Sequence, residues 1–134
     1  MNSADPDLSL FIGNGGKLLL YHGWSDPGIP ADASVRYYTN VRETLGANTA
    51  DESVRLFMVP GMGHCRGGIG TDQFDPAAAL DRWVRTDVAP ARIEASRIEN
   101  GSVVRTRPLC AFPATAVYDG SGSTDAAENF ECRE

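Results

Sequence analysis

The sequence predicts an α/β fold in which one helix joins two parallel strands. Continuous apolar runs at 17–22 and 54–59 lack the alternation of half-exposed strands, and such runs are typical of strands buried on both faces. Between them, apolar residues recur at helical spacing from 31 to 45. Because parallel strands need a crossover connection of this length, the order strand, helix, strand indicates a right-handed βαβ unit.

Composition and charge exclude several classes of protein. The 134 residues suffice for one domain or part of one, and 42% hydrophobic with 22% charged residues is ordinary globular composition. A formal net charge of −6 and the lack of a basic cluster argue against nucleic-acid binding. No apolar run approaches the roughly 20 residues that span a bilayer, and residues 1–5 do not resemble a signal peptide. We therefore expect neither a nucleic-acid nor a membrane partner.

The residues before the helix form a lead-in, a strand and a loop. Residues 5–11 change from polar to apolar and are expected to make a short lead-in or a helical turn. The strand 17–22 then runs into a loop at 23–30, which contains two glycines and two prolines.

The helix and the second strand complete the crossover. The helix 31–45 ends where Gly46 takes the C′ position, and its apolar face consists of Val35, Tyr38, Val41 and Leu45. Residues 48–53 are polar and are expected to form a loop. The strand 54–59 follows, and Pro60 halts it.

A second helix follows a glycine-rich segment. Residues 66–74 contain three glycines and are expected to form a flexible connection. Asp75 provides an N-cap, Pro76 suits the first helical position, and the helix is expected to run to about residue 86. Pro90 prevents a long continuation.

The last third of the chain predicts a hairpin and a turn-rich tail. Residues 92–98 and 102–107 alternate between polar and apolar, and Asn100-Gly101 between them favours a type I′ turn. Residues 108–134 show no regular period, so a covalent staple between the two cysteines of this tail would explain how it stays folded.

Two side chains at the ends of the predicted strands could form a catalytic pair. Asp26 follows the first strand, and His64 follows the second in a glycine-rich loop. Because ligands of parallel sheets bind beyond the carboxyl ends of the strands, the two are expected to meet there. Alone, Asp26 before a proline reads as a turn residue and His64 as a structural histidine, but together they fit the acid and base of a triad.

The other reactive side chains favour structural interpretations. His22 lies inside the end of a strand, so packing or hydrogen bonding is favoured over catalysis. A metal site formed by His22, His64 and Cys65 is disfavoured, because their spacing matches no closed tetrahedral site. Cys65 cannot easily face its neighbour His64, so a disulfide partner is favoured over a nucleophile. Trp24 either packs around its loop or faces substrate.

Three segments of the sequence resemble a known family. They are 16–27, which contains Tyr-His-Gly-Trp-Ser-Asp, 59–65, which ends in Gly-His-Cys, and 105–110, which reads Arg-Thr-Arg-Pro-Leu-Cys. Together they resemble the carboxyl-terminal part of the tannase and feruloyl esterase family of α/β-hydrolases. The resemblance covers nearly the whole chain, from about residue 5 to residue 132.

The resemblance implies roles for five residues. Asp26 would be the acid and His64 the base of a Ser-Asp-His triad. Cys65 would be half of a disulfide whose partner precedes the catalytic serine and is absent from this chain. Cys110 would pair with Cys132. Members of the family are usually secreted or periplasmic.

The sequence departs from the family by having no Gly-x-Ser-x-Gly motif. The family's nucleophile elbow, oxyanion hole and calcium-bearing lid lie upstream of the matching region. We therefore expect residues 1–134 to be a single partial domain: a carboxyl-terminal fragment of a serine esterase acting on phenolic acid esters, inactive alone, with no cofactor and no metal in this part. Its substrate-binding residues are not assigned. The alternative is a non-catalytic, disulfide-stapled binding or assembly module.

The resemblance also places the strand 17–22 inside a sheet, between the strand 54–59 and an upstream strand. Without that upstream strand, the backbone donors and acceptors beside Leu18, Leu19 and Leu20 would lack partners. Such an edge can pair with a second copy of the chain. We therefore expect a homo-oligomer formed through the exposed sheet edge.

Overall fold

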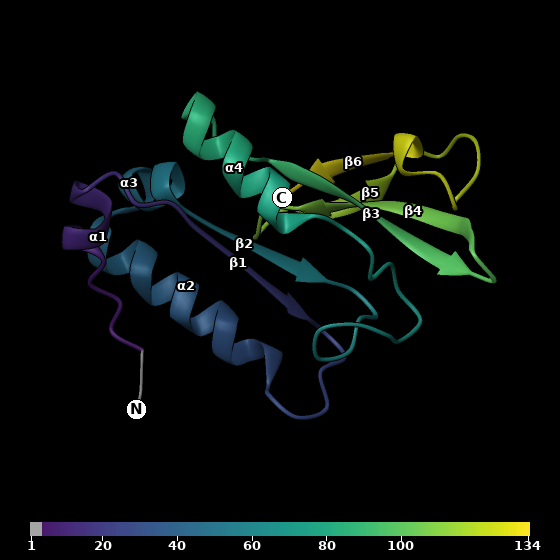
Figure 1. The fold of residues 1–134 in the computed structure, drawn as a ribbon, viewed down its shortest axis with the longest axis horizontal. Helices are drawn as coiled ribbons and strands as arrows, with labels where there is room; N and C mark the ends of the chain where they lie inside the picture. Colours follow the sequence, from purple (N-terminus) through teal and green to yellow (C-terminus); the bar gives the residue numbers. More distant parts are fainter. Residues whose placement is uncertain (1–3) are drawn as a thin grey trace.

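The computed structural model describes residues 4–134, and Figure 1 shows how they fold. Two helices connect the parallel strands β1 and β2, and α4 and two antiparallel hairpins follow, which confirms the predicted α/β class. In chain order the elements are α1 (Ser9–Gly13), β1 (Leu18–Gly23), α2 (Ala31–Leu45), α3 (Ala47–Ser53), β2 (Val54–Val59), α4 (Pro76–Thr86), β3 (Arg92–Glu99), β4 (Ser102–Cys110), β5 (Thr115–Tyr118), the 3₁₀ turn η1 (Ala127–Asn129) and β6 (Phe130–Arg133).

The strands β1 and β2 form a parallel pair, as the sequence predicted. Their register aligns Leu18 with Val54 and Gly23 with Val59. The helix α2 lies along one side of the pair, and α4 with the β3–β4 hairpin lies on the other (Figure 1). Because both strands end at the same edge, the loops after Gly23 and Val59 leave the sheet next to each other.

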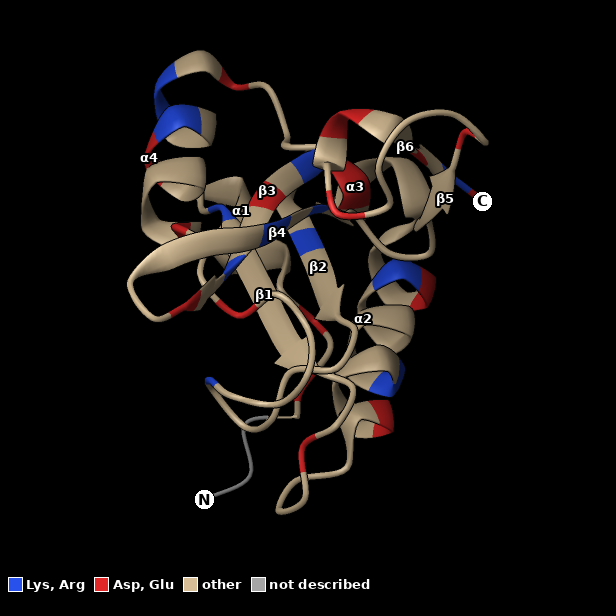
Figure 2. Cartoon of the chain, turned by 90° about the vertical axis from the view of Figure 1, so that its right-hand side faces the viewer, with Lys and Arg blue, Asp and Glu red and all other residues tan. Residues whose placement is uncertain are grey.

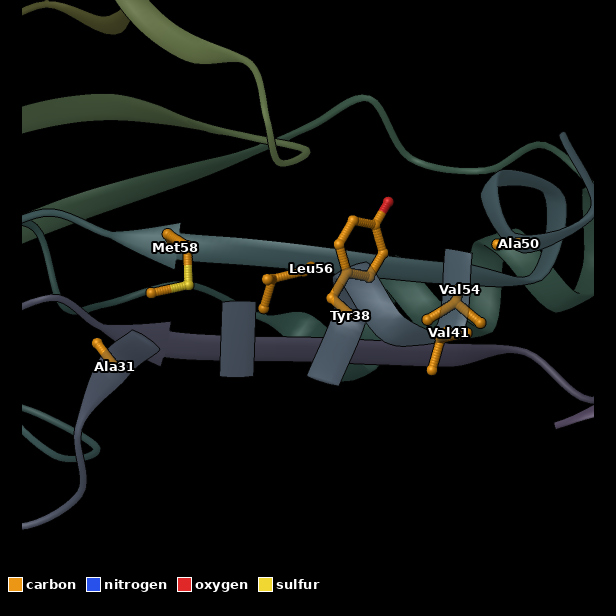
Figure 3. Packing of buried hydrophobic residues seen from close by; sticks show 7 residues of the cluster. All are labelled: Ala31, Tyr38, Val41, Ala50, Val54, Leu56 and Met58. Carbon is orange, nitrogen blue, oxygen red and sulfur yellow. The ribbon is translucent and has the colours of Figure 1, made fainter. Parts of the chain in front are cut away.

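The strand β2 is the centre of the hydrophobic core. Its residues Val54, Leu56 and Met58 pack against α2 and α3 (Figure 3). Phe57 and Val59 point to the opposite face and pack with residues of β3 and β4. Both faces of β2 are therefore apolar, which explains why its sequence shows no alternation.

Residues 48–53 do not form the predicted polar loop, because they belong to the helix α3. Ala50 is fully buried in the cluster against α2. Asp51 accepts hydrogen bonds from Tyr38 Oη and from the guanidinium of Arg42, both on α2. The prediction was wrong because a short helix that buries little more than one alanine has almost no apolar periodicity in its sequence.

The strands β3 and β4 form the predicted hairpin. Asn100 and Gly101 have φ values of 50° and 80°, both in the left-handed region that a type I′ turn requires. The strand β4 continues to Cys110, beyond the predicted end. Just after it, the N–H of Phe112 donates to the carbonyl of Leu56 over 2.8 Å, so the hairpin is tied to β2.

The tail contains a second hairpin, β5 with β6, where no regular structure was expected. The disulfide between Cys110 and Cys132 is confirmed, with Cα atoms 5.5 Å apart. The guanidinium of Arg107 on β4 lies 3.8 Å from the ring centroid of Phe130 on β6. Strands of four residues are too short to show a period in the sequence, and these contacts hold them against β4.

Acidic and basic residues are interspersed over the elements, and Figure 2 shows both signs on α2 and on α4. In the part of the chain that the structure describes, basic residues do not collect into one stripe (Figure 2). No helix among residues 4–134 is long and apolar enough to cross a membrane.

Replacing both Cys110 and Cys132 by alanine should lower the free energy of unfolding by about 3 kcal/mol, because a bond across this loop restricts the unfolded chain. The loop spans 22 positions of sequence. Urea unfolding of the two proteins measures the difference. Cys65→Ala, at the exposed free cysteine, is the matched control and should unfold like the wild type. An unchanged midpoint in the double variant would contradict the expected contribution.

Candidate active site

The loops that follow β1 and β2 are joined by backbone hydrogen bonds. The N–H of Trp24 donates to the carbonyl of Val59, and the N–H of Ser25 donates to that of Met62, each over 3.0 Å. A Cβ atom at Gly23 would lie 2.1 Å from the carbonyl oxygen of Gly63, so only glycine permits this approach. The loops that carry Asp26 and His64 therefore lie against each other.

Asp26 and His64 meet as the sequence predicted. His64 Nδ1 lies 2.5 Å from Asp26 Oδ2. The Asp26 side chain is 0% exposed, whereas that of His64 is 58% exposed, so the imidazole is held at one edge and open at the other. Within residues 4–134, His64 Nε2 has no hydrogen-bond partner. This ring can therefore accept a proton from a group placed at Nε2.

Backbone donors keep the carboxyl group of Asp26 ionised. Its Oδ1 accepts hydrogen bonds from the N–H of Gly28 at 2.8 Å and of Ile29 at 2.9 Å. The hydrogen bond from Ile29 is the largest cause of a pKa well below the ordinary 3.8, and those from Gly28, His64 and His22 add to it. Burial acts in the opposite direction but does not prevail.

His22 is hydrogen-bonded and packed, as the sequence favoured, but it also touches Asp26. Its Nε2 lies 3.0 Å from Asp26 Oδ2, and its Nδ1 lies 2.7 Å from Ser34 Oγ. Sequence reasoning missed both contacts. The spacing of four between His22 and Asp26 has a meaning only on a helix, and these residues lie on a strand and a loop, so the sequence carried no signal for the contact.

The glycine-rich segment after His64 is folded and not the flexible connection that was expected. Met62 and Gly68 form a β-bridge, and the N–H of Gly63 donates to the carbonyl of Gly67 over 3.0 Å. Arg97 of β3 donates to the carbonyl of Gly68 over 2.8 Å. The glycines permit tight turns here, and the hydrogen bonds then fix the loop that carries the histidine.

The remaining candidate residues make no side-chain hydrogen bond with Asp26 or His64 among residues 4–134. Cys65 is exposed and free. Trp24 is 44% exposed and lines a cavity of about 480 Å³ together with Pro60 and, from the tail side, Phe112 and Phe130. Among residues 4–134, no three His, Cys, Asp or Glu side chains are grouped so that they could hold a metal ion.

Asp26→Asn should alter how stability depends on pH. Because the folded-state pKa of Asp26 lies below its ordinary 3.8, its ionisation stabilises the fold above about pH 4 and loses this effect as pH falls. The difference in free energy of unfolding between wild type and variant should thus be largest near neutral pH and shrink in acid. Urea unfolding at several pH values tests this, with Asp81→Asn as an exposed control. A difference that grows in acid would contradict it.

Comparisons with known proteins find an esterase family over the whole chain. The family described as "Tannase and feruloyl esterase" matches residues 1–133. An uncharacterized esterase of Xanthomonas campestris is 40% identical over 163 residues, covering 98% of this chain and 28% of the relative. The mono(2-hydroxyethyl) terephthalate hydrolase of Piscinibacter sakaiensis is 44% identical over 135 residues, covering 97% of this chain and 22% of the relative.

Solved structures of esterases also match this chain. A crystal structure of an esterase from Aspergillus oryzae matches with a TM-score of 0.87 and 32% identity, covering 96% of this chain and 29% of that one. Feruloyl esterase B from the same organism matches with a TM-score of 0.84 and 31% identity, over 96% of this chain and 29% of that one. The chain thus spans less than a third of the length of these relatives. The resemblance seen in the sequence is confirmed: this chain belongs to the tannase and feruloyl esterase family.

Proposed function

We propose that this chain supplies the acid and the base of a Ser-Asp-His triad in a carboxylic-ester hydrolase. Asp26 is the acid and His64 is the base. The observation that carries the proposal is the hydrogen bond between the buried carboxylate and His64 Nδ1, which leaves Nε2 open. The alternative, a non-catalytic module, does not require a buried carboxylate to hold an exposed imidazole, and nothing in the comparisons favours it.

The proposed reaction is acyl transfer to a serine that lies outside residues 1–134 and then to water. His64 Nε2 takes the serine proton as the serine oxygen attacks the ester carbonyl, and it returns that proton to the departing alcohol. A water molecule then attacks the carbonyl of the acyl-enzyme as His64 takes its proton, and His64 returns this proton to the serine oxygen as the serine ester bond breaks and the acid leaves. Asp26 fixes the Nδ1–H tautomer of His64 and stabilises the imidazolium that forms in each step.

Cys65 bears on the compartment in which the whole protein is proposed to fold. Cys65 is free, exposed and adjacent to His64, which suits a disulfide to a cysteine beside that serine. Such a bond, like the one between Cys110 and Cys132, requires an oxidising compartment, so the whole protein is proposed to be secreted or periplasmic.

Relatives named feruloyl esterase and terephthalate hydrolase act on esters of aromatic acids, and the same substrate class is proposed here.

A chimera tests the triad. The Piscinibacter sakaiensis hydrolase is the suitable host, because its match of 135 residues covers 97% of this chain and so contains few insertions. With residues 1–134 in place of the matching segment, the chimera should hydrolyse mono(2-hydroxyethyl) terephthalate. Asp26→Asn should reduce kcat on the order of 10⁴-fold while the circular dichroism spectrum stays unchanged. Near-normal turnover of this variant would remove Asp26 from the triad.

Two controls accompany the chimera. Asp81→Asn makes the same chemical change at an exposed carboxylate that pairs with Arg85, and it should leave kcat unchanged. The isolated chain should not hydrolyse simple phenolic esters detectably, because a base without a nucleophile and an oxyanion hole is insufficient. Hydrolysis by the isolated chain that His64→Ala abolishes would contradict the proposal that the nucleophile lies elsewhere.

The free edge of β1 should make the isolated chain associate. Among residues 4–134, β1 pairs in a ladder only with β2, so the backbone groups on its other edge lack strand partners. Light scattering after size-exclusion chromatography should find dimers or larger assemblies. Tyr21→Lys, at a 42% exposed residue of β1, should weaken association, and Val84→Lys, at a 60% exposed residue of α4, should not. A monomer at all concentrations would contradict this expectation.

A further inference from the structure

We propose that His22 and Ser34 form a positioning arm that holds the carboxylate of Asp26 through Oδ2, the same oxygen that contacts His64. The inference rests on the proposed roles of Asp26 and His64. Neither His22 nor Ser34 touches the reacting atoms in this arrangement. They act through Asp26, because they fix the position of its Oδ2 atom and thereby the orientation of the carboxylate toward His64.

The arm is a continuous line of hydrogen bonds. Ser34 Oγ lies 2.7 Å from His22 Nδ1, His22 Nε2 lies 3.0 Å from Asp26 Oδ2, and this oxygen lies 2.5 Å from His64 Nδ1. Ser34 belongs to α2 and His22 to β1, both packed into the core of the βαβ unit. The His22 side chain is only 10% exposed. The loop that carries Asp26 is therefore anchored to two rigid elements.

The chemistry of the donors and acceptors fixes one nitrogen of each ring. An ionised carboxylate only accepts hydrogen bonds, so the nitrogen of each histidine that faces Asp26 must carry a proton. A neutral His22 is then protonated at Nε2, and its Nδ1 accepts the hydrogen bond that the Ser34 hydroxyl donates. His64 is protonated at Nδ1. His22 is thus assigned the Nε2–H tautomer and His64 the Nδ1–H tautomer, and both N–H groups donate to Asp26 Oδ2.

A neutral His22 suits this place better than a cation would. Asp26 Oδ1 already accepts two backbone N–H groups and Oδ2 accepts two imidazoles, so all four acceptor sites are filled and the carboxylate is held in one orientation. When His64 gains a proton in the reaction, it becomes a cation beside Oδ2. A second cation at His22 would repel the His64 imidazolium and weaken its attraction to Asp26. A neutral His22 orients the carboxylate by its hydrogen bond without this repulsion.

Nitrogen NMR of the 15N-labelled chain tests the assignment directly. The chain has only two histidines, so His64→Gln identifies the signals of each ring. Near neutral pH, long-range 1H–15N spectra should show the Nε2–H tautomer for His22 and the Nδ1–H tautomer for His64. An Nδ1–H or a doubly protonated His22 would overturn the proposal.

Ser34 variants separate positioning from packing. Ser34→Ala removes the donor to His22 Nδ1 and should shift the nitrogen signals of both rings, whereas Ser34→Thr keeps a hydroxyl and should restore them. Ser53→Ala is the control, because it removes the hydroxyl of a buried serine that lies on α3 and makes no side-chain hydrogen bond with residues 4–134. Unchanged His64 signals in Ser34→Ala would overturn the proposal.

Kinetics of the chimera distinguish a failure of the arm from a failure of the proposed function. Ser34→Ala should lower kcat about tenfold, the scale of one lost hydrogen bond, with KM unchanged. If turnover depends on His64 but is the same in Ser34→Ala, the arm is refuted and the triad stands. If turnover is independent of His64, the triad is refuted, and the tautomers seen by NMR still decide whether the arm exists.

Discussion

The site depends on the buried carboxylate of Asp26. Its oxygens accept two backbone N–H groups from the loop that follows, one imidazole from β1 and one from the loop after β2. A buried charge is costly unless it is hydrogen-bonded, and here every acceptor position has a donor. One of these hydrogen bonds, that with His64, also connects the two loops. Asp26 therefore contributes both to the electrostatics of the site and to the contact between its two loops.

The approach of the two loops requires particular residues. Gly23 lies so close to the backbone of Gly63 that a side chain would collide with it, and backbone hydrogen bonds then join the loops. The parallel register of β1 and β2 brings the loops to the same edge of the sheet. The packing of β2 between two apolar clusters holds that register, because a shift by one residue would reverse which side chains face each cluster.

The hairpins connect the site to the rest of the chain. The β3–β4 hairpin holds the His64 loop through Arg97 and is joined to β2 just beyond Cys110. The disulfide to Cys132 then attaches the last hairpin to β4. Family membership agrees with this fold, since the solved esterase structures from Aspergillus oryzae match it over 96% of this chain.

The sequence by itself determined the elements with a strong period and the place where Asp26 and His64 meet. The apolar run of β2, the helical spacing of α2, the Asn100-Gly101 turn and the pairing of Asp26 with His64 all follow from local patterns or from strand order. Only the tertiary structure decided the rest. Residues 48–53 fold into α3 because of contacts with α2, and the β5–β6 hairpin is too short to have a period. The His22 and Ser34 contacts arise where β1 packs on α2, and no local pattern encodes a contact made by packing.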